Sequence, residues 1–176
     1  MVVTGVPGAG KTTLGAALAL TLRVPFLSLD SIKEQLYSRD DTAGAYQLRM
    51  AAEAELSRRL GEVGGVAVVD IWVAPQRDTE RVSSWLLAQA ADVVEVLCRV
   101  PADVAVRRYA GRARSSPHRL ADSATLQRIR DAAEQMSPLG IGRCIEVDTS
   151  SPVDLERLAE RLRGRSRVCG GGSGDA

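Results

Sequence analysis

The feature that most restricts the fold of this chain is a glycine-rich segment that begins at the fifth residue. Residues 5–12 read Gly-Val-Pro-Gly-Ala-Gly-Lys-Thr and match the pattern G-x-x-x-x-G-K-[ST] at every fixed position. The apolar residues before the segment favour a strand, and the Ala- and Leu-rich residues 11–22 favour a helix. Between a strand and a helix, such a loop points its backbone N–H groups inward, and the helix dipole adds positive charge at the same place. The sequence therefore predicts a phosphate-binding loop.

The residues of this loop have different roles in binding a nucleoside triphosphate. Lys11 is expected to bridge the β- and γ-phosphates, and the hydroxyl of Thr12 is expected to complete the coordination of Mg²⁺. The alternative is a glycine-rich turn with a solvated lysine, which the strand-to-helix context disfavours. We expect nucleotide contacts from Gly5, Val6, Pro7, Gly8, Ala9, Gly10, Lys11, Thr12 and Thr13.

Short apolar runs alternate with helical patterns along the rest of the chain, which is typical of a parallel sheet covered by helices. The run from Val66 to Val69 is continuously apolar, as expected for a central strand that is buried on both faces. A last helix is expected after Ser151 as its N-cap, with Pro152 at its first position. We expect strands near residues 1–4, 25–29, 66–70, 93–98 and 143–147, and earlier helices near 11–22, 43–61, 76–91, 102–114 and, after a loop at 115–123, up to about 136.

The length of 176 residues allows one domain with one core and is too short for two domains. Residues 1–163 carry the alternating pattern and are expected to form that domain. From Gly164 the chain becomes basic and then Gly/Ser-rich, so it has no means of burying apolar area. We therefore expect residues 164–176 to be a disordered tail.

The composition argues against nucleic-acid and membrane partners. The formal net charge is +1 and aromatic residues make up 3% of the chain, so a basic surface that stacks on bases is not expected. The sequence shows no basic leader and no run of about 18 apolar residues, which favours a cytoplasmic protein. Cys98, Cys144 and Cys169 are widely spaced, suit no metal site, and are expected to be inert thiols.

Two aspartates follow predicted strands at the sheet edge where open α/β folds bind their ligands. Asp30 follows the second strand, and the alternative is that it only caps the next helix. Ser31 and Glu34 have the spacing of a capping box, which would leave the Asp30 carboxylate available for chemistry. Asp70 ends the third strand, at the place of a carboxylate that holds Mg²⁺, and the alternative is that it only terminates the strand.

A basic segment contains four arginines in eight residues, Arg107, Arg108, Arg112 and Arg114. On a helix Arg108 and Arg112 share one face, and Arg107 and Arg114 share another. Planar guanidinium groups suit a transferring phosphoryl group, and a solvated helix face is the alternative. Arg108 and Arg112 are our candidates for phosphate contacts.

Further arginines follow the third predicted strand. Arg77 and Arg81 either line a pocket for the phosphoryl acceptor or form surface pairs with Asp78 and Glu80. The polar residues between Asp30 and Gly65 are candidates for the same pocket, namely Tyr37, Arg39, Tyr46, Gln47 and Arg49.

With these motifs the chain resembles the small stand-alone P-loop kinases of the AAA-type ATP-binding group. This group includes chloramphenicol phosphotransferase, gluconate-kinase-like enzymes, zeta toxins and polynucleotide 5′-hydroxyl kinase. The resemblance spans about residues 1–163 and implies a three-layer α/β P-loop NTPase fold with a five-stranded parallel sheet of order 2-3-1-4-5. It also implies that Asp30 deprotonates the acceptor hydroxyl, that residues of about 107–122 form a lid, and that Thr149 and Ser150 contact the adenine ring.

Two positions bear on the branch of this group. Lys33 stands where the polynucleotide kinases carry an arginine, so the resemblance to that branch is incomplete. His118 lies where relatives have a histidine-containing lid loop, and it either touches substrate or is an exposed histidine without a role.

These observations predict an ATP-dependent kinase that uses Mg²⁺ to phosphorylate a hydroxyl of a small molecule such as an antibiotic, a sugar or a nucleoside. Asp30 is the expected base, and Lys11, Arg108 and Arg112 are the expected charge stabilisers. We expect a monomer or a homodimer. The alternatives are a polynucleotide 5′-hydroxyl kinase, which needs a basic channel, and a hydrolytic or non-catalytic nucleotide switch. Ile71 follows Asp70 where ATPase motors usually place a glutamate, which disfavours hydrolysis as the main task.

Overall fold

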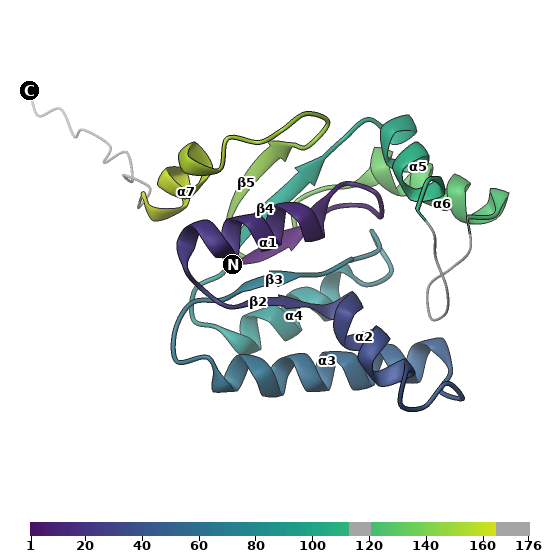
Figure 1. Ribbon diagram of the computed structural model, residues 1–176, viewed down its shortest axis with the longest axis horizontal. Coiled ribbons are helices and arrows are strands. Elements are labelled where there is room, and N and C mark those ends of the chain that lie inside the picture. The colour runs from purple at the N-terminus through teal and green to yellow at the C-terminus, as the bar shows by residue number, and fades with distance from the viewer. Residues whose placement is uncertain (113–120, 165–176) are drawn as a thin grey trace, which may run out of the picture.

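A computed structural model of the protein describes residues 1–112 and 121–164 and contains a five-stranded parallel sheet (Figure 1). The strand order is β2-β3-β1-β4-β5, which confirms the predicted order. Each strand lies at one of the predicted apolar runs, and β3 lies inside the sheet as its continuous apolar sequence indicates. The strands are β1 (Val2–Thr4), β2 (Phe26–Ser28), β3 (Val68–Asp70), β4 (Val94–Arg99) and β5 (Arg143–Asp148).

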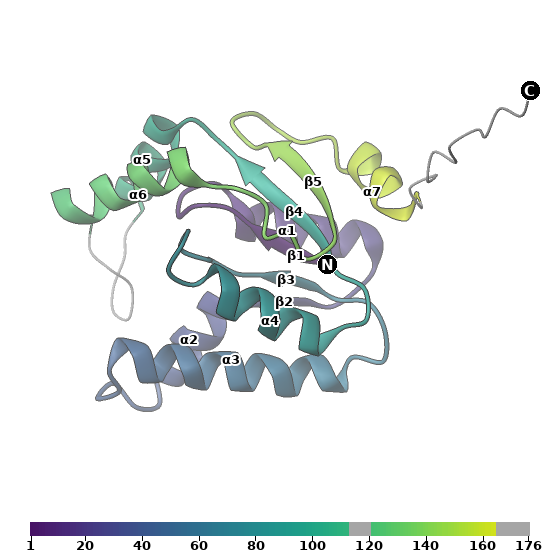
Figure 2. The same ribbon diagram turned by 180° about the vertical axis from the view of Figure 1, so that it is seen from behind.

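Helices cover both faces of the sheet and give the three layers that the resemblance implied (Figures 1 and 2). One face carries α1 and α7, which pack on each other, and the other carries α3 and α4. The helices α5 and α6 pack together near the carboxyl end of β4. The helices in the described residues are α1 (Lys11–Leu22), α2 (Leu29–Tyr37), α3 (Ala45–Glu62), α4 (Thr79–Gln89), α5 (Ala102–Ala110), α6 (Ser123–Gln135) and α7 (Leu155–Arg163).

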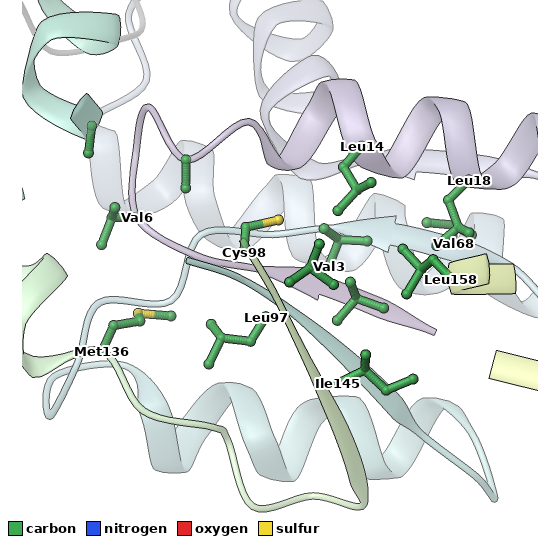
Figure 3. Close-up of a cluster of buried hydrophobic side chains, with 14 of the residues drawn as sticks. Val3, Val6, Leu14, Leu18, Val68, Leu97, Cys98, Met136, Ile145 and Leu158 are labelled. Carbon is green, nitrogen blue, oxygen red and sulfur yellow. The ribbon is translucent and has the colours of Figure 1, made fainter. Parts of the chain in front are cut away.

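Two hydrophobic cores lie on opposite faces of the sheet. Val2 and Val3 are neighbours in β1, and they point to opposite faces because side chains alternate along a strand. The first core contains Val3, Leu14, Leu18 and Leu158 (Figure 3), and the second contains Val2, Ile32, Leu56 and Val82. Since both faces of β1 are buried, three residues are enough for the central strand that leads into the glycine-rich loop.

The start of α2 differs from the prediction. Ser28 is the N-cap, and its hydroxyl oxygen accepts a hydrogen bond from the N–H of Ser31 at 3.4 Å. The predicted capping box of Ser31 and Glu34 is wrong, because the helix begins at Leu29 and Ser31 already lies inside its first turn. Asp30 is therefore the second residue of the helix rather than a residue in front of it.

The start of α7 was also placed too early. Asp154 is the N-cap and accepts a hydrogen bond from the N–H of Arg157 at 3.0 Å, so Ser151 is not the cap. Residues 149–153 instead form an extended turn, in which the Asp148 carboxylate accepts a hydrogen bond from the N–H of Ser150 at 2.8 Å. Aspartate is as strong an N-cap as serine, and Arg108 of α5 holds the carbonyls of Thr149 and Ser150, so the helix starts after Asp154 rather than after Ser151.

The helix predicted at 102–114 is shorter than expected. It ends at Ala110, and Gly111 follows as the C-cap, with its N–H donating to the carbonyl of Arg107 at 3.0 Å. Glycine is a poor helix former, which accounts for the early end. Arg112 therefore lies beyond the helix, while Arg114 and His118 lie outside the described residues.

None of the helices within residues 1–112 and 121–164 combines the length and the apolar character that a membrane span requires.

Candidate active site

The glycine-rich loop connects β1 to α1 at the carboxyl edge of the sheet. Gly5, Gly8 and Gly10 have φ angles of 137°, 89° and 84°, which are unfavourable for residues with a side chain. A Cβ on Gly5 would lie 2.8 Å from the carbonyl oxygen of Cys98, and one on Gly8 would overlap the carbonyl oxygen of Ala105. The loop therefore fits tightly between β4 and α5, and its shape depends on glycine.

Replacing Gly8 with alanine should weaken ATP binding at least about tenfold. The positive φ costs about 1–2 kcal/mol for a residue with a Cβ, the overlap with Ala105 adds to it, and about 1.4 kcal/mol already corresponds to tenfold in affinity. Calorimetric titration with Mg·ATP measures the effect. Gly61→Ala is the matched control, because a Cβ there meets nothing within 4 Å and should leave affinity unchanged. Equal affinities of both variants would mean that the loop tolerates a side chain at Gly8.

The side chain of Lys11 is held back over the loop. Its Nζ donates a hydrogen bond to the carbonyl of Val6 at 3.2 Å and lies 6.0 Å from the centroid of the Trp72 ring. Lys11 is only 8% exposed, so its ammonium group sits in a partly desolvated site. A single carbonyl and an aromatic face are weak partners for a buried cation, which leaves the ammonium group suited to an anionic ligand.

Thr12 and Asp70 meet at the ends of α1 and β3. The Thr12 hydroxyl donates to Oδ2 of Asp70 at 2.6 Å, and the Ser28 hydroxyl donates to the same oxygen at 3.3 Å. Asp70 is buried, and the pairing of Ser28 with Asp70 across β2 and β3 sets this register. The result is a compact group of oxygen atoms directly beside the loop.

The chemistry of this oxygen group fits Mg²⁺, which prefers oxygen ligands and is usually held by one or two protein groups together with phosphates. Within residues 1–112 and 121–164, no three His, Cys, Asp or Glu side chains converge into a metal site. A cation at Thr12 and Asp70 would therefore need further oxygens, from a bound nucleotide or from water.

A second set of contacts joins the loop to the turn after β5. The Thr149 hydroxyl donates to the carbonyl of Ala9 at 2.7 Å, with the carbonyl of Arg99 at 3.1 Å. Arg108 of α5 donates to the carbonyls of Thr149 at 2.8 Å and Ser150 at 3.0 Å. These bonds tie the loop, α5 and the turn into one wall.

This wall borders a pocket of about 460 Å³. Gly10 and Thr13 line it on the side of the loop and α1, Arg108 and Arg112 line it from α5 and beyond, and residues 149–153 close it. The structure thus brings together the predicted phosphate arginines and the predicted adenine-contacting turn. Arg107 does not join them, because it is exposed and its Nη1 lies 3.7 Å from Asp103.

Asp30 lies two residues beyond β2, on the same sheet edge as Asp70. Its carboxylate is 3.4 Å from Nζ of Lys33, and its side chain is 49% exposed. The sheet therefore brings Asp30 to the edge that holds the loop, with about half of its side chain exposed.

Arginines and a glutamate form a group between α3, α4 and the loop after β3. Glu53 is buried, accepts from Arg49 Nε at 2.5 Å, and accepts from Arg81 at 2.5 Å and 3.1 Å. Burial alone would raise the pKa of Glu53, but the hydrogen bonds from the two arginines outweigh it and hold the pKa below its ordinary value. Arg49 also donates from Nη1 to the carbonyl of Trp72 at 3.2 Å.

Glu53 is a member of this group that the sequence did not predict. The i,i+4 spacing of Arg49 and Glu53 on one predicted helix was a readable signal. The partner Arg81 lies on another helix, so its contact with Glu53 could not be read from spacing. Arg77 turns away and binds both carboxylate oxygens of Asp78, at 2.9 Å and 2.7 Å, which is the alternative that the sequence left open.

The two described cysteines are poor nucleophiles. Burial raises the pKa of the Cys98 thiol to about 12 and that of the Cys144 thiol to about 11. Both side chains therefore stay protonated at neutral pH, in agreement with the prediction of inert thiols. Cys169 lies outside the described residues.

The chain is similar to a known protein family and to solved structures. A family model described as an AAA domain matches residues 1–136. No curated protein matches the chain. A "putative kinase" from Chloroflexus aurantiacus j-10-fl is 26% identical, with a TM-score of 0.69 over 92% of this chain and 93% of the other.

Two further solved structures share the fold at lower identity. Shikimate kinase from Acinetobacter baumannii, in complex with shikimate, is 20% identical, with a TM-score of 0.61 over 92% of this chain and 88% of the other. A gluconokinase from Sinorhizobium meliloti 1021 is 20% identical, with a TM-score of 0.56 over 92% and 93%.

Proposed function

The chain belongs to the AAA domain family, and from this premise we propose that it is an ATP-dependent kinase that phosphorylates a hydroxyl group of a small molecule. The observation that carries the proposal is the hydrogen bond between Thr12 and Asp70 at 2.6 Å, beside a loop whose lysine has only weak partners. Thr12, Asp70 and Lys11 are the groups that a nucleotide-binding loop of this kind uses on Mg²⁺ and phosphates. Structural likeness to kinases supports the same reaction class.

Each residue has a role that follows from its position. Bound Mg·ATP supplies the γ-phosphoryl group, which passes to the acceptor oxygen while ADP leaves. Lys11 and the loop N–H groups would hold the phosphates, and Thr12 with Asp70 would hold the metal ion. Asp30, which lies half-exposed at the same sheet edge, takes the proton of the acceptor hydroxyl.

The pocket beside α5 receives the nucleoside end of ATP. Arg108 and Arg112 line this pocket close to Gly10 and Thr13, so their guanidinium groups reach phosphates that lie on the loop. The Thr149 hydroxyl is engaged by the Ala9 carbonyl, and we therefore assign Thr149 a role in fixing the loop as well as in contacting the base. Most of the rate enhancement would come from positioning and electrostatics.

Measuring ATP consumption with and without acceptors tests the proposal. We expect a panel of hydroxyl compounds, covering sugars, hydroxy acids, nucleosides and antibiotics, to contain a member that stimulates ADP formation and becomes phosphorylated. Equal ADP formation with and without every acceptor would instead identify a hydrolytic switch. Stimulation by a 5′-hydroxyl oligonucleotide alone would identify a polynucleotide kinase.

A further inference from the structure

One buried nitrogen atom lacks a partner in the group of Arg49, Glu53 and Arg81. In the described part of the chain, Nη2 of Arg49 is the buried side-chain nitrogen or oxygen for which no hydrogen-bond partner exists. The other nitrogens of this guanidinium are engaged, Nε by Glu53 and Nη1 by the carbonyl of Trp72. Buried donors in native proteins are nearly always paired with protein groups or ordered water, so this nitrogen is a place for an ordered water or for a ligand.

The position of Arg49 relates this nitrogen to the reaction site. The chain runs from the carboxyl edge of the sheet into α2 and α3, and from β3 through its loop into α4, so the first turns of α3 and α4 lie near that edge (Figures 1 and 2). Trp72 links the two places, because its carbonyl binds Arg49 while its ring lies 6.0 Å from Nζ of Lys11. Trp72 is thus a shared neighbour of Arg49 and of the lysine that we assign to the phosphates.

The charges of the group do not balance. Two guanidinium groups, on Arg49 and Arg81, share the single carboxylate of Glu53. Asp78 is the next acidic neighbour, but both of its oxygens are bound by Arg77. One positive charge is left over in the group; the side chain of Arg81 is 41% exposed and reaches solvent, whereas that of Arg49 is only 15% exposed. Such a charge favours an anionic ligand over a neutral one.

We propose that Arg49 recognises an anionic oxygen group, a carboxylate or a phosphate, that the phosphoryl acceptor carries in addition to its reacting hydroxyl. This inference rests on the proposed kinase function and narrows its substrate class. A planar guanidinium forms short, charge-assisted hydrogen bonds with both kinds of anion. Arg49 is then a specificity-determining residue, and Glu53 and Arg81 are positioning residues that fix its orientation.

A purely structural role explains less of the geometry. Arg81 alone supplies two hydrogen bonds to Glu53 and already joins α4 to α3. Arg49 adds a second bond to Glu53 and one to a backbone carbonyl, and it leaves its last nitrogen unpaired inside the protein. A structural arginine would be expected to satisfy that nitrogen, whereas a substrate-binding arginine keeps it for the ligand.

The experiment compares matched acceptors on the wild type and on Arg49→Gln. The probes are D-gluconate against D-gluconamide and D-ribose phosphate against D-ribose, added to the acceptor panel that tests the kinase reaction. We expect anionic acceptors to be preferred, and Arg49→Gln to raise their KM at least about tenfold while leaving kcat and the KM for ATP nearly unchanged. Arg49→Lys should lose less affinity for anionic acceptors than Arg49→Gln, because lysine keeps the positive charge but lacks the planar guanidinium that can make two parallel hydrogen bonds.

The control variant is Arg58→Gln, an exposed arginine of the same helix that pairs with Glu55 and Glu62. It should leave every KM unchanged. A best acceptor that is neutral, or an Arg49→Gln effect that is equal for anionic and neutral members, overturns the inference and leaves the kinase intact. A preference for gluconate over gluconamide indicates that Arg49 binds a carboxylate, and a preference for ribose phosphate over ribose indicates that it binds a phosphate.

A different result separates the two proposals. If no acceptor is phosphorylated, the kinase proposal fails, and the same probes are then tested by thermal unfolding with a non-hydrolysable Mg·ATP analogue present. If Arg49 binds the anion, gluconate or ribose phosphate should raise the Tm of the wild type more than that of Arg49→Gln. Equal shifts, or no shift in either protein, overturn the anion site as well.

Discussion

Replacing Lys11 with alanine is expected to lower kcat/KM for ATP by about 10²–10³, as removal of one preorganised donor to developing charge does in other enzymes. Lys11 is 8% exposed, and within the described residues its ammonium group donates to the Val6 carbonyl at 3.2 Å and lies 6.0 Å from the Trp72 ring, so its attraction to phosphate is little screened. Affinity and turnover should both fall, because Lys11 contacts phosphates before and during transfer. Calorimetric titration with Mg·ATP measures the first effect, and steady-state ADP formation measures the second.

The thermal stability of Lys11→Ala shows whether the substitution disturbs the fold. Lys11 is the first residue of α1, and alanine is a better helix former, so the helix should persist. The expected Tm without nucleotide is therefore close to that of the wild type, while the rise in Tm on adding Mg·ATP should disappear. Unchanged nucleotide affinity would show that the lysine does not contact phosphate and would remove the basis for the nucleotide site.

The parts of the site that sequence predicted are those that depend on local chain geometry. The conformation of the glycine-rich loop depends on three positive φ angles and on its place between a strand and a helix. Both features follow from residues that are adjacent in the sequence. The edge position of Asp30 and Asp70 follows from parallel strands that end together. The order of the strands came from the resemblance, because no local signal distinguishes one buried apolar run from another.

The remaining parts depend on residues that are distant in sequence. Thr149 fixes the carbonyl of Ala9 across 140 residues, and no spacing rule connects them. Glu53 lies 28 residues from Arg81, and their contact depends on how α3 and α4 pack. The cap of α7 was misplaced for a related reason, since Arg108 from α5 holds the carbonyls of the turn in front of that helix. Tertiary contacts decided each of these features over a plausible local pattern.

Replacing Asp30 with asparagine should leave ATP binding intact and lower phosphoryl transfer by about 10²–10⁴, which is the contribution of a positioned general base. Asparagine keeps the size of the side chain and one carbonyl oxygen, but it cannot accept the proton of the acceptor hydroxyl. The loss should appear in kcat with the acceptor present, and the KM for ATP should stay near the wild-type value. Rapid-quench measurement of a single turnover separates the chemical step from product release.

Asp103→Asn is a closely matched control for this variant. Asp103 is the second residue of α5 as Asp30 is of α2, and each pairs with a basic side chain one turn later, Arg107 and Lys33 respectively. Both substitutions remove a negative charge from a helix N-terminus, so they should lower stability by a similar amount, about 0.3–1 kcal/mol. Asp30 follows β2, which pairs with the strand that carries Asp70, whereas Asp103 follows β4 on the other side of β1, so only Asp30→Asn should lose transfer. If the two variants transfer phosphoryl groups equally well, the carboxylate of Asp30 contributes to α2 alone, and the base is another group at that edge.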